Sequence, residues 1–146
     1  NEKKNINEHY LPVIAINEIL FNNGINVITD RKIEIVLRFT LHNFFKELFI
    51  ILTIKHTKSG LIIYQYGNSY SNYILQNLEI GKWEVMVNLL LNNFKNDIYS
   101  LNVTINGIME NGMAFSVTSN SFDFEVKTED FYLGNDCNWD IKKISV

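Results

Sequence analysis

Apolar and polar residues alternate with a period of two along most of the chain. In residues 33–42 every second side chain is a large apolar one, and Glu34, Arg38 and Thr40 stand among the positions between them. The same alternation recurs in residues 83–91, 99–105 and 122–127. A strand shows this pattern when one face of its sheet packs on a core and the other face meets water. The chain is therefore expected to fold mainly as β-sheet.

Turn-forming residues mark the boundaries between the strands. The apolar runs are separated by Asn23-Gly24, Ser59-Gly60, Asn106-Gly107 and Asn111-Gly112, and such pairs tolerate the positive φ of tight reversals. Residues 48–54 are apolar at almost every position, which predicts a central strand. Eight strands are expected, over residues 13–20, 33–42, 48–55, 61–66, 83–91, 98–105, 113–118 and 122–127. Short strands at this fairly even spacing favour an all-β fold, an antiparallel β-sandwich of the immunoglobulin-like or jelly-roll type.

The two ends of the chain depart from this pattern. Residues 1–11 are polar and begin without a methionine, so we expect them to be a lead-in from an upstream domain. The remaining residues, 12–146, have the size of a single domain. A loop after the eighth strand leads to one further short strand, predicted over residues 139–146. That strand can pair with its own sheet or with another copy of the chain.

Charge and composition argue against several classes of partner. The net charge is −3, the pI is near 5.6 and the basic residues do not form a large cluster, so no nucleic-acid partner is expected. The longest apolar runs are far shorter than the roughly 20 residues that span a bilayer. Cys137 is the only cysteine, which rules out an intramolecular disulfide. An isolated, inert thiol fits a reducing compartment such as the cytoplasm.

Patterns that carry catalysis are missing from the sequence. His9, His42 and His56 share no spacing suited to a metal site, and neither a phosphate-binding loop nor a G-x-S-x-G elbow occurs. Paired carboxylates could hydrolyse a glycosidic bond only if the fold placed two of them about 5–10 Å apart in a cleft. We therefore expect no catalytic residue, no metal and no cofactor, and a function based on binding.

Tyrosine, amide and hydroxyl residues concentrate in residues 64–73. Flat rings cover the C–H faces of sugars, and amides and hydroxyls exchange hydrogen bonds with sugar hydroxyl groups; a tyrosine combines an apolar ring with a polar end. The segment supplies four candidate carbohydrate contacts, Tyr64, Tyr66, Asn68 and Tyr73. The alternative is that Tyr64 and Tyr66 are ordinary sheet residues with satisfied hydroxyls and that the rest is a polar loop.

A second set of candidates lies on the polar side of the strand predicted at residues 33–42. Arg38, Thr40 and His42 could line a groove if that side were a concave sheet face, and a solvated face is the alternative. Trp83 and Tyr99, by contrast, fall in register with the apolar positions of their strands and are expected in the core.

The order of these features along the chain is itself informative. It begins with Ile19-Leu20-Phe21-Asn22-Asn23-Gly24, Ile50-Ile51-Leu52-Thr53-Ile54-Lys55 and Tyr64-Gln65-Tyr66-Gly67-Asn68-Ser69. It continues with Leu78-Glu79-Ile80-Gly81, Ile98-Tyr99-Ser100-Leu101-Asn102-Val103 and Phe122-Asp123-Phe124-Glu125-Val126. From about residue 13 to residue 126 this succession resembles the carboxy-terminal domain of Wzt, the nucleotide-binding subunit of ABC transporters that export O-antigen polysaccharide. Family members tend to have Pro-Gly where this chain has Lys95-Asn96-Asp97, a departure that affects no candidate binding residue.

The resemblance implies a cytoplasmic β-sandwich that binds carbohydrate without catalysis. Such a domain recognises a feature of the finished glycan of lipopolysaccharide, typically at its non-reducing end, and so qualifies the polymer for export. The resemblance also implies a homodimer that exchanges an edge or terminal strand, an upstream nucleotide-binding domain, and a transporter membrane subunit that holds the protein at the inner face of the inner membrane. Alternatives from other classes are a sandwich that only dimerises its parent protein and a glycan-modifying enzyme.

Overall fold

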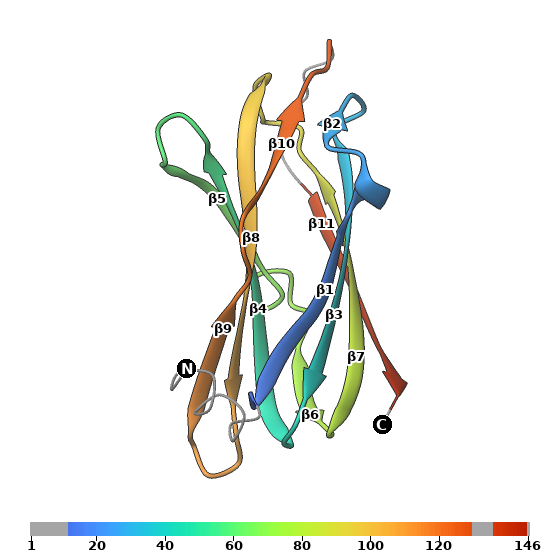
Figure 1. Ribbon diagram of the computed structural model, residues 1–146, viewed down its shortest axis with the longest axis vertical. Helices are drawn as coiled ribbons and strands as arrows, with labels where there is room; N and C mark the ends of the chain where they lie inside the picture. Colours follow the sequence, from blue (N-terminus) through green and yellow to red (C-terminus); the bar gives the residue numbers. More distant parts are fainter. Residues whose placement is uncertain (1–11, 130–135, 146) are drawn as a thin grey trace, which may run out of the picture.

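A computed structural model describes residues 12–129 and 136–145. These residues form eleven β-strands and one short 3-10 helix, and the strands are arranged as two layers of sheet (Figure 1). The strands are β1 (Ile14–Phe21), β2 (Val27–Ile28), β3 (Lys32–Leu41), β4 (Phe45–His56), β5 (Ile62–Gly67), β6 (Leu75–Leu78), β7 (Gly81–Leu90), β8 (Asp97–Ile108), β9 (Ala114–Thr118), β10 (Phe122–Val126) and β11 (Asp136–Ser145). The helix η1 (Asn22–Gly24) follows β1. The all-β sandwich predicted from the sequence is confirmed. No helix in the described ranges is long and apolar enough to cross a membrane.

The strands divide into two sheets of unequal size. Sheet A has four strands in the order β1-β3-β7-β11, and sheet B has seven. The main path of sheet B is β2-β10-β8-β4-β5, with β6 paired to β4 and β9 paired to β8. The ladders are antiparallel, apart from the two-residue parallel pairing of β2 with β10. As a result, β5 is an edge strand of sheet B and β11 is an edge strand of sheet A.

Alternation along each strand sorts its side chains between the core and the solvent. In β3 the buried side chains are those of Ile33, Ile35, Leu37, Phe39 and Leu41. Tyr99 in β8 is buried as predicted and packs against Phe124, with ring centroids 5.7 Å apart. Trp83 packs against the edge of the core but stays partly exposed, and its Nε1 donates to the carbonyl of Glu79 at 2.9 Å. The core therefore lies between the two sheets, where the alternating pattern places it.

All eight strands expected from the sequence are present, with ends that differ by a few residues. The turn expected at Asn106-Gly107 is wrong, because both residues pair with β4 and β9 inside β8. β4 lies between β8 and β5, in agreement with the central strand that its apolar sequence predicts. The alternating pattern misses β2 and β6. β2 has only two residues, and β6 has four, with Asn77 in the left-handed region at φ 55°. Neither is long or regular enough to show a two-residue rhythm.

The strand expected near the carboxyl end is β11, and it belongs to sheet A. It pairs with β7 from Asp136 opposite Leu90 to Ser145 opposite Lys82. On its core side, Trp139 is 9% exposed and thus seals the edge of the sandwich. Pairing within its own sheet is one of the two alternatives that the sequence leaves open, and exchange between two copies stays a prediction. The expected lead-in, residues 1–11, lies outside the described residues.

A candidate binding groove at the edge of the sandwich

Two of the predicted site residues, Tyr64 and Tyr66, extend from the edge strand β5. In the ladder with β4, Tyr66 lies opposite Leu52 and Tyr64 lies opposite Ile54. Leu52 and Ile54 point into the core, so the two tyrosines share that face of sheet B. Because β5 is at the edge, the Tyr64 ring reaches the open side of the sandwich, whereas the Tyr66 ring packs in the buried core beside it.

The two rings form a stacked pair. Their centroids are 4.1 Å apart and the ring planes differ by 16°. Tyr66, the inner ring, is 6% exposed, whereas Tyr64 is 38% exposed. Phe94 lies behind them, with its centroid 6.4 Å from that of Tyr64. A buried ring therefore holds an exposed ring in a fixed orientation, which is a suitable arrangement for contact with a flat apolar surface.

The hydroxyl of Tyr66 is a polar group left unsatisfied inside the protein. It is fully buried and has no hydrogen-bond partner among the described residues. Burial raises the pKa of this hydroxyl strongly, and the neighbouring Tyr64 and Cys137 side chains raise it further. The group is thus neutral at any physiological pH. A buried hydroxyl without a partner costs free energy, and such groups are often found where function requires them.

A groove of about 660 Å³ opens beside this pair, and we call it the tyrosine groove. It is lined by Tyr64, Gln65, Tyr66, Gly67, Tyr70, Ser71 and Cys137. Tyr70 is 77% exposed. A Cβ atom at Gly67 would lie 3.1 Å from the Tyr70 ring, so the absence of a side chain at Gly67 lets that ring settle against the backbone. The groove thus offers flat rings together with amide and hydroxyl groups.

The loop after β5 is fastened at both ends by the other predicted residues of this segment. Asn68 is buried: its Oδ1 accepts from the backbone N–H of Ile50 at 2.7 Å, and its Nδ2 donates to the Tyr73 carbonyl at 2.9 Å. The Tyr73 hydroxyl accepts from the backbone N–H of Ile141 in β11 at 3.1 Å. Both side chains are therefore engaged in holding the loop, and their place is behind the groove lining.

The loop also contacts β11 through a second hydrogen bond. Trp139 Nε1 donates to Ser71 Oγ at 3.1 Å. Together with the Tyr73 contact, this bond ties the loop of sheet B to the edge strand of sheet A. The tyrosine groove is therefore built from two segments more than sixty residues apart in the chain, 64–71 and β11.

The remaining predicted site residues belong to sheet A and lie apart from the tyrosines. Arg38 occupies the outer face, where its Nη1 donates to Glu18 Oε1 at 2.7 Å and its Nε donates to Glu84 Oε1 at 3.0 Å. Hydrogen bonds from Arg38 and then Lys142 hold the pKa of the Glu84 carboxyl below its ordinary value. The guanidinium is thus already paired with two carboxylates.

Thr40 and His42 also fall outside the tyrosine groove. Thr40 Oγ1 donates to Asn17 Oδ1 at 2.6 Å, and His42 is exposed just beyond the end of β3. The seven residues predicted from the sequence therefore do not meet in one site. Tyr64 and Tyr66 line the groove, Asn68 and Tyr73 support it, and the three residues from the strand at 32–42 lie on another surface.

Sequence reasoning missed several residues of the lining. Tyr70 and Ser71 lie inside the tyrosine- and amide-rich segment, so composition could have included them. Cys137, expected to be inert, contributes a half-buried thiol to the groove wall. No local signal could have placed it there, because its position depends on the long-range pairing of β11 with β7.

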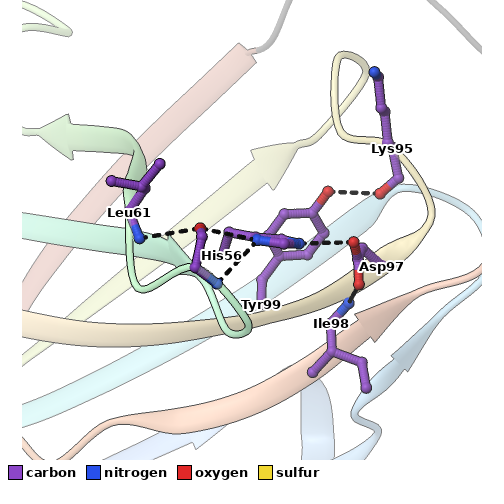
Figure 2. Close-up of polar contacts among 7 residues, drawn as sticks. His56, Leu61, Lys95, Asp97, Ile98 and Tyr99 are labelled. Atoms are coloured by element: carbon purple, nitrogen blue, oxygen red, sulfur yellow. Dashed lines mark hydrogen bonds and ion pairs between the residues drawn. The ribbon is translucent and has the colours of Figure 1, made fainter.

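One other group of side chains has the residue types of a hydrolytic triad. His56 Nε2 lies 2.7 Å from Asp97 Oδ2, and His56 Nδ1 lies 3.0 Å from Ser59 Oγ. Figure 2 shows the His56 ring directed at Asp97, beside the Tyr99 hydroxyl that donates to the Lys95 carbonyl. The Ser59 hydroxyl also accepts from a backbone N–H within its own turn, and none of these three side chains lines the tyrosine groove. The contacts fasten the β4–β5 hairpin to the start of β8.

The arrangement of strands is similar to that of a solved protein domain. A crystal structure of the C-terminal domain of Wzt matches this chain with a TM-score of 0.65 and 12% sequence identity, covering 86% of this chain and 80% of that chain. At this identity the similarity establishes the fold. It confirms the structural resemblance inferred from the order of strands and turns.

Two other solved structures match less closely. One is the CARDB domain of a Pyrococcus furiosus protein in complex with di-metal ions, with a TM-score of 0.43 and 15% identity, covering 81% of this chain and 96% of that chain. The other is a Niemann-Pick type C2 protein from the Japanese carpenter ant, with a TM-score of 0.45 and 12% identity, covering 83% of this chain and 96% of that chain. No protein-family model matches the sequence, and no curated protein matches it.

Proposed function

We propose that this domain is a noncatalytic carbohydrate-binding module that recognises the terminus of a finished O-antigen polysaccharide and so qualifies it for export by an ABC transporter. The observation that carries the proposal is the tyrosine groove, where the exposed Tyr64 ring is stacked on the buried Tyr66 ring. A ring held in place in this way can cover the apolar face of a sugar at little cost in conformational entropy.

The polar groups of the groove suit the hydroxyl groups of the same ligand. Gln65 and Ser71 line it, and the only titratable lining groups are phenols and one thiol. Such a surface favours an uncharged ligand that both donates and accepts hydrogen bonds. The unsatisfied hydroxyl of Tyr66 belongs to a residue of this lining, and a ligand group that reached it would supply the missing hydrogen-bond partner.

The fold supports the same proposal. The sandwich has the architecture of the Wzt C-terminal domain, and the resemblance found in the sequence implies a glycan-recognition role for that architecture. On this proposal the parent protein carries an upstream nucleotide-binding domain, associates with a transporter membrane subunit, and works as a homodimer in the cytoplasm at the inner face of the inner membrane. Exchange of β11 between two copies is part of the proposal.

Calorimetric titration of the domain with the O-antigen polysaccharide of the strain that encodes it tests the proposal. We expect saturable binding by the wild type, and binding about 5- to 150-fold weaker in Tyr64→Ala and in Tyr70→Ala, since the loss of one stacking ring removes about 1–3 kcal/mol. Met113→Ala truncates an exposed side chain in the turn before β9 and serves as the matched control. Absence of binding by the folded wild-type domain would refute the proposal.

A structural module that only dimerises its parent protein is the second candidate. The observation in its favour is the run of exposed aliphatic side chains at the start of the edge strand β5: Leu61, just before the strand, and Ile62 and Ile63, its first two residues, are 66%, 55% and 47% exposed. An uncharged apolar edge strand is prone to pair with another chain. Sedimentation equilibrium of the wild type and of Ile62→Lys, together with the titration above, distinguishes a dimerisation module from a carbohydrate-binding module. A dimerisation module requires a wild-type dimer that the lysine disrupts, and it requires that the wild type has no affinity for the polysaccharide.

A further inference from the structure

A second groove, of about 700 Å³, lies at one end of sheet A. Its floor is a row of three side chains in cross-strand register: Glu34 in β3, Asn88 in β7 and Asn138 in β11. The row lies on the outer face of the sheet, because the adjacent row of Ile35, Val87 and Trp139 is buried. The segment between β1 and β3 forms the facing wall. We call this cavity the amide groove.

The wall is held in place by a side chain that also lines the groove. Asn22 Nδ2 donates to the Ile25 carbonyl at 3.2 Å, and Asn22 Oδ1 accepts from the backbone N–H of Glu34 at 3.5 Å. Ile25 and Val27 present exposed aliphatic surface on the same wall, 59% and 41% exposed. The groove therefore has one polar side and one apolar side.

The polar floor is available to a ligand. Asn88 and Asn138 are exposed, and within residues 12–129 and 136–145 their amides form no side-chain hydrogen bond. Each amide can donate and accept at once, which matches the hydroxyl groups of a sugar. Glu34 and Asp30 outnumber the single Lys32 among the charged lining residues, so the groove disfavours an anionic ligand.

The amide groove and the tyrosine groove meet at one strand. Cys137 faces the tyrosine groove, and the next residue, Asn138, faces the amide groove. β11 is the edge strand of sheet A, so no described strand covers its outer edge. A chain molecule bound in the tyrosine groove can therefore continue around this edge and reach the amide floor within a short distance.

We propose that the amide groove is a second carbohydrate subsite, which binds an uncharged sugar residue further along the same polymer whose end occupies the tyrosine groove. This inference rests on the function proposed above and extends it to the internal part of the glycan. It assigns Asn88 and Asn138 as ligand-contacting residues, with Glu34 accepting from sugar hydroxyls and Ile25 covering an apolar sugar face. Recognition would then depend on the length of the bound fragment as well as on its terminus.

Titration with fragments of graded length tests this assignment. The probes are oligosaccharides that keep the native non-reducing terminus, prepared from the encoding strain's polysaccharide by partial hydrolysis. The variants are the double substitution Asn88→Ala with Asn138→Ala and, as the matched control, Asn102→Ala with Asn106→Ala on the outer face of sheet B. All are exposed or half-exposed strand residues, so each variant is expected to fold, which circular dichroism verifies.

We expect wild-type affinity to rise with fragment length. The Asn88/Asn138 variant should lose about tenfold in affinity for long fragments and nothing for the shortest, because the loss of two ligand hydrogen bonds amounts to roughly that factor. The control should match the wild type throughout. If the Asn88/Asn138 variant binds long fragments as the wild type does, or loses affinity equally at every length, the amide groove is not the subsite. If the wild type binds no fragment at all, the proposed function fails and this inference fails with it.

Discussion

Replacing Tyr66 with phenylalanine should make the free domain more stable. The Tyr66 hydroxyl is buried and has no hydrogen-bond partner among the described residues, whereas in the unfolded chain it binds water. Removing it abolishes that loss of solvation and leaves the stacked ring in place. The opposite is expected of Tyr99→Phe, because the buried Tyr99 hydroxyl donates to the Lys95 carbonyl at 2.7 Å.

The magnitude follows from the cost of the unsatisfied group. A buried polar group without a partner costs about 1–3 kcal/mol, and the neighbouring Cys137 sulfur can offset part of this for Tyr66. We expect Tyr66→Phe to raise the free energy of unfolding by about 1 kcal/mol and the melting temperature by roughly 3 °C. Tyr99→Phe should lower the free energy of unfolding by about 1 kcal/mol, because a net hydrogen bond is lost.

Urea denaturation of both variants, followed by tryptophan fluorescence, measures these changes. A higher free energy of unfolding in Tyr66→Phe and a lower one in Tyr99→Phe would support the structure of the groove. A lower free energy of unfolding in Tyr66→Phe would show that the Tyr66 hydroxyl does have a hydrogen-bond partner, contrary to the structure. Titration of the same variant with polysaccharide adds a second test: if the ligand satisfies this hydroxyl, Tyr66→Phe should bind more weakly despite its greater stability.

Three further predictions concern the framework around the groove. Gly107→Ala should lower the free energy of unfolding by about 1–3 kcal/mol in denaturant titrations, because the new Cβ would lie 2.6 Å from the buried Phe45 ring; an unchanged midpoint would contradict this packing. Asn68→Ala should cost about 2–3 kcal/mol in the same assay, since it leaves buried backbone groups without partners, and a cost below 0.5 kcal/mol would count against that role. The hydrogen bond from His56 lowers the pKa of Asp97 below its ordinary value, so Asp97 stabilises the fold at higher pH. This contribution is lost as pH falls through the folded-state pKa of Asp97. In His56→Ala, carbon-13 NMR titration should show the pKa of Asp97 rising toward its ordinary value, and an unchanged pKa would exclude the contact.

The parts of the fold that depend on local sequence patterns can be predicted from the sequence. The alternation from residue 33 to residue 42 places β3 and its buried face correctly, because side chains in a strand must alternate between the two faces. The apolar run before His56 likewise predicts the central position of β4. β2 could not be predicted in this way, because a strand of two residues is too short to show an alternating pattern.

The site was only partly accessible from the sequence, because a groove joins residues that are distant in the chain. The composition around Tyr64 points to the segment that lines the tyrosine groove. It cannot distinguish the Tyr64 ring, which faces the groove, from Asn68, whose side-chain amide is hydrogen-bonded to buried backbone groups. Arg38 has the polar position expected of a binding residue, but two carboxylates from neighbouring strands pair with it. Cys137 and Asn138 enter the two grooves only through the pairing of β11 with β7.

Chemical-shift mapping by NMR can locate the polysaccharide on the surface of the domain and so test whether the tyrosine groove binds it. Proton–nitrogen spectra of the labelled domain, recorded during titration with the encoding strain's O-antigen polysaccharide, report which backbone amides sense the ligand. We expect saturable shifts at the tyrosine groove, in residues 64–71 and at Cys137, with smaller changes around Arg38. Shifts that cluster on the outer face around Arg38 and Thr40 and spare residues 64–71, or no shifts at all, would contradict binding at the tyrosine groove.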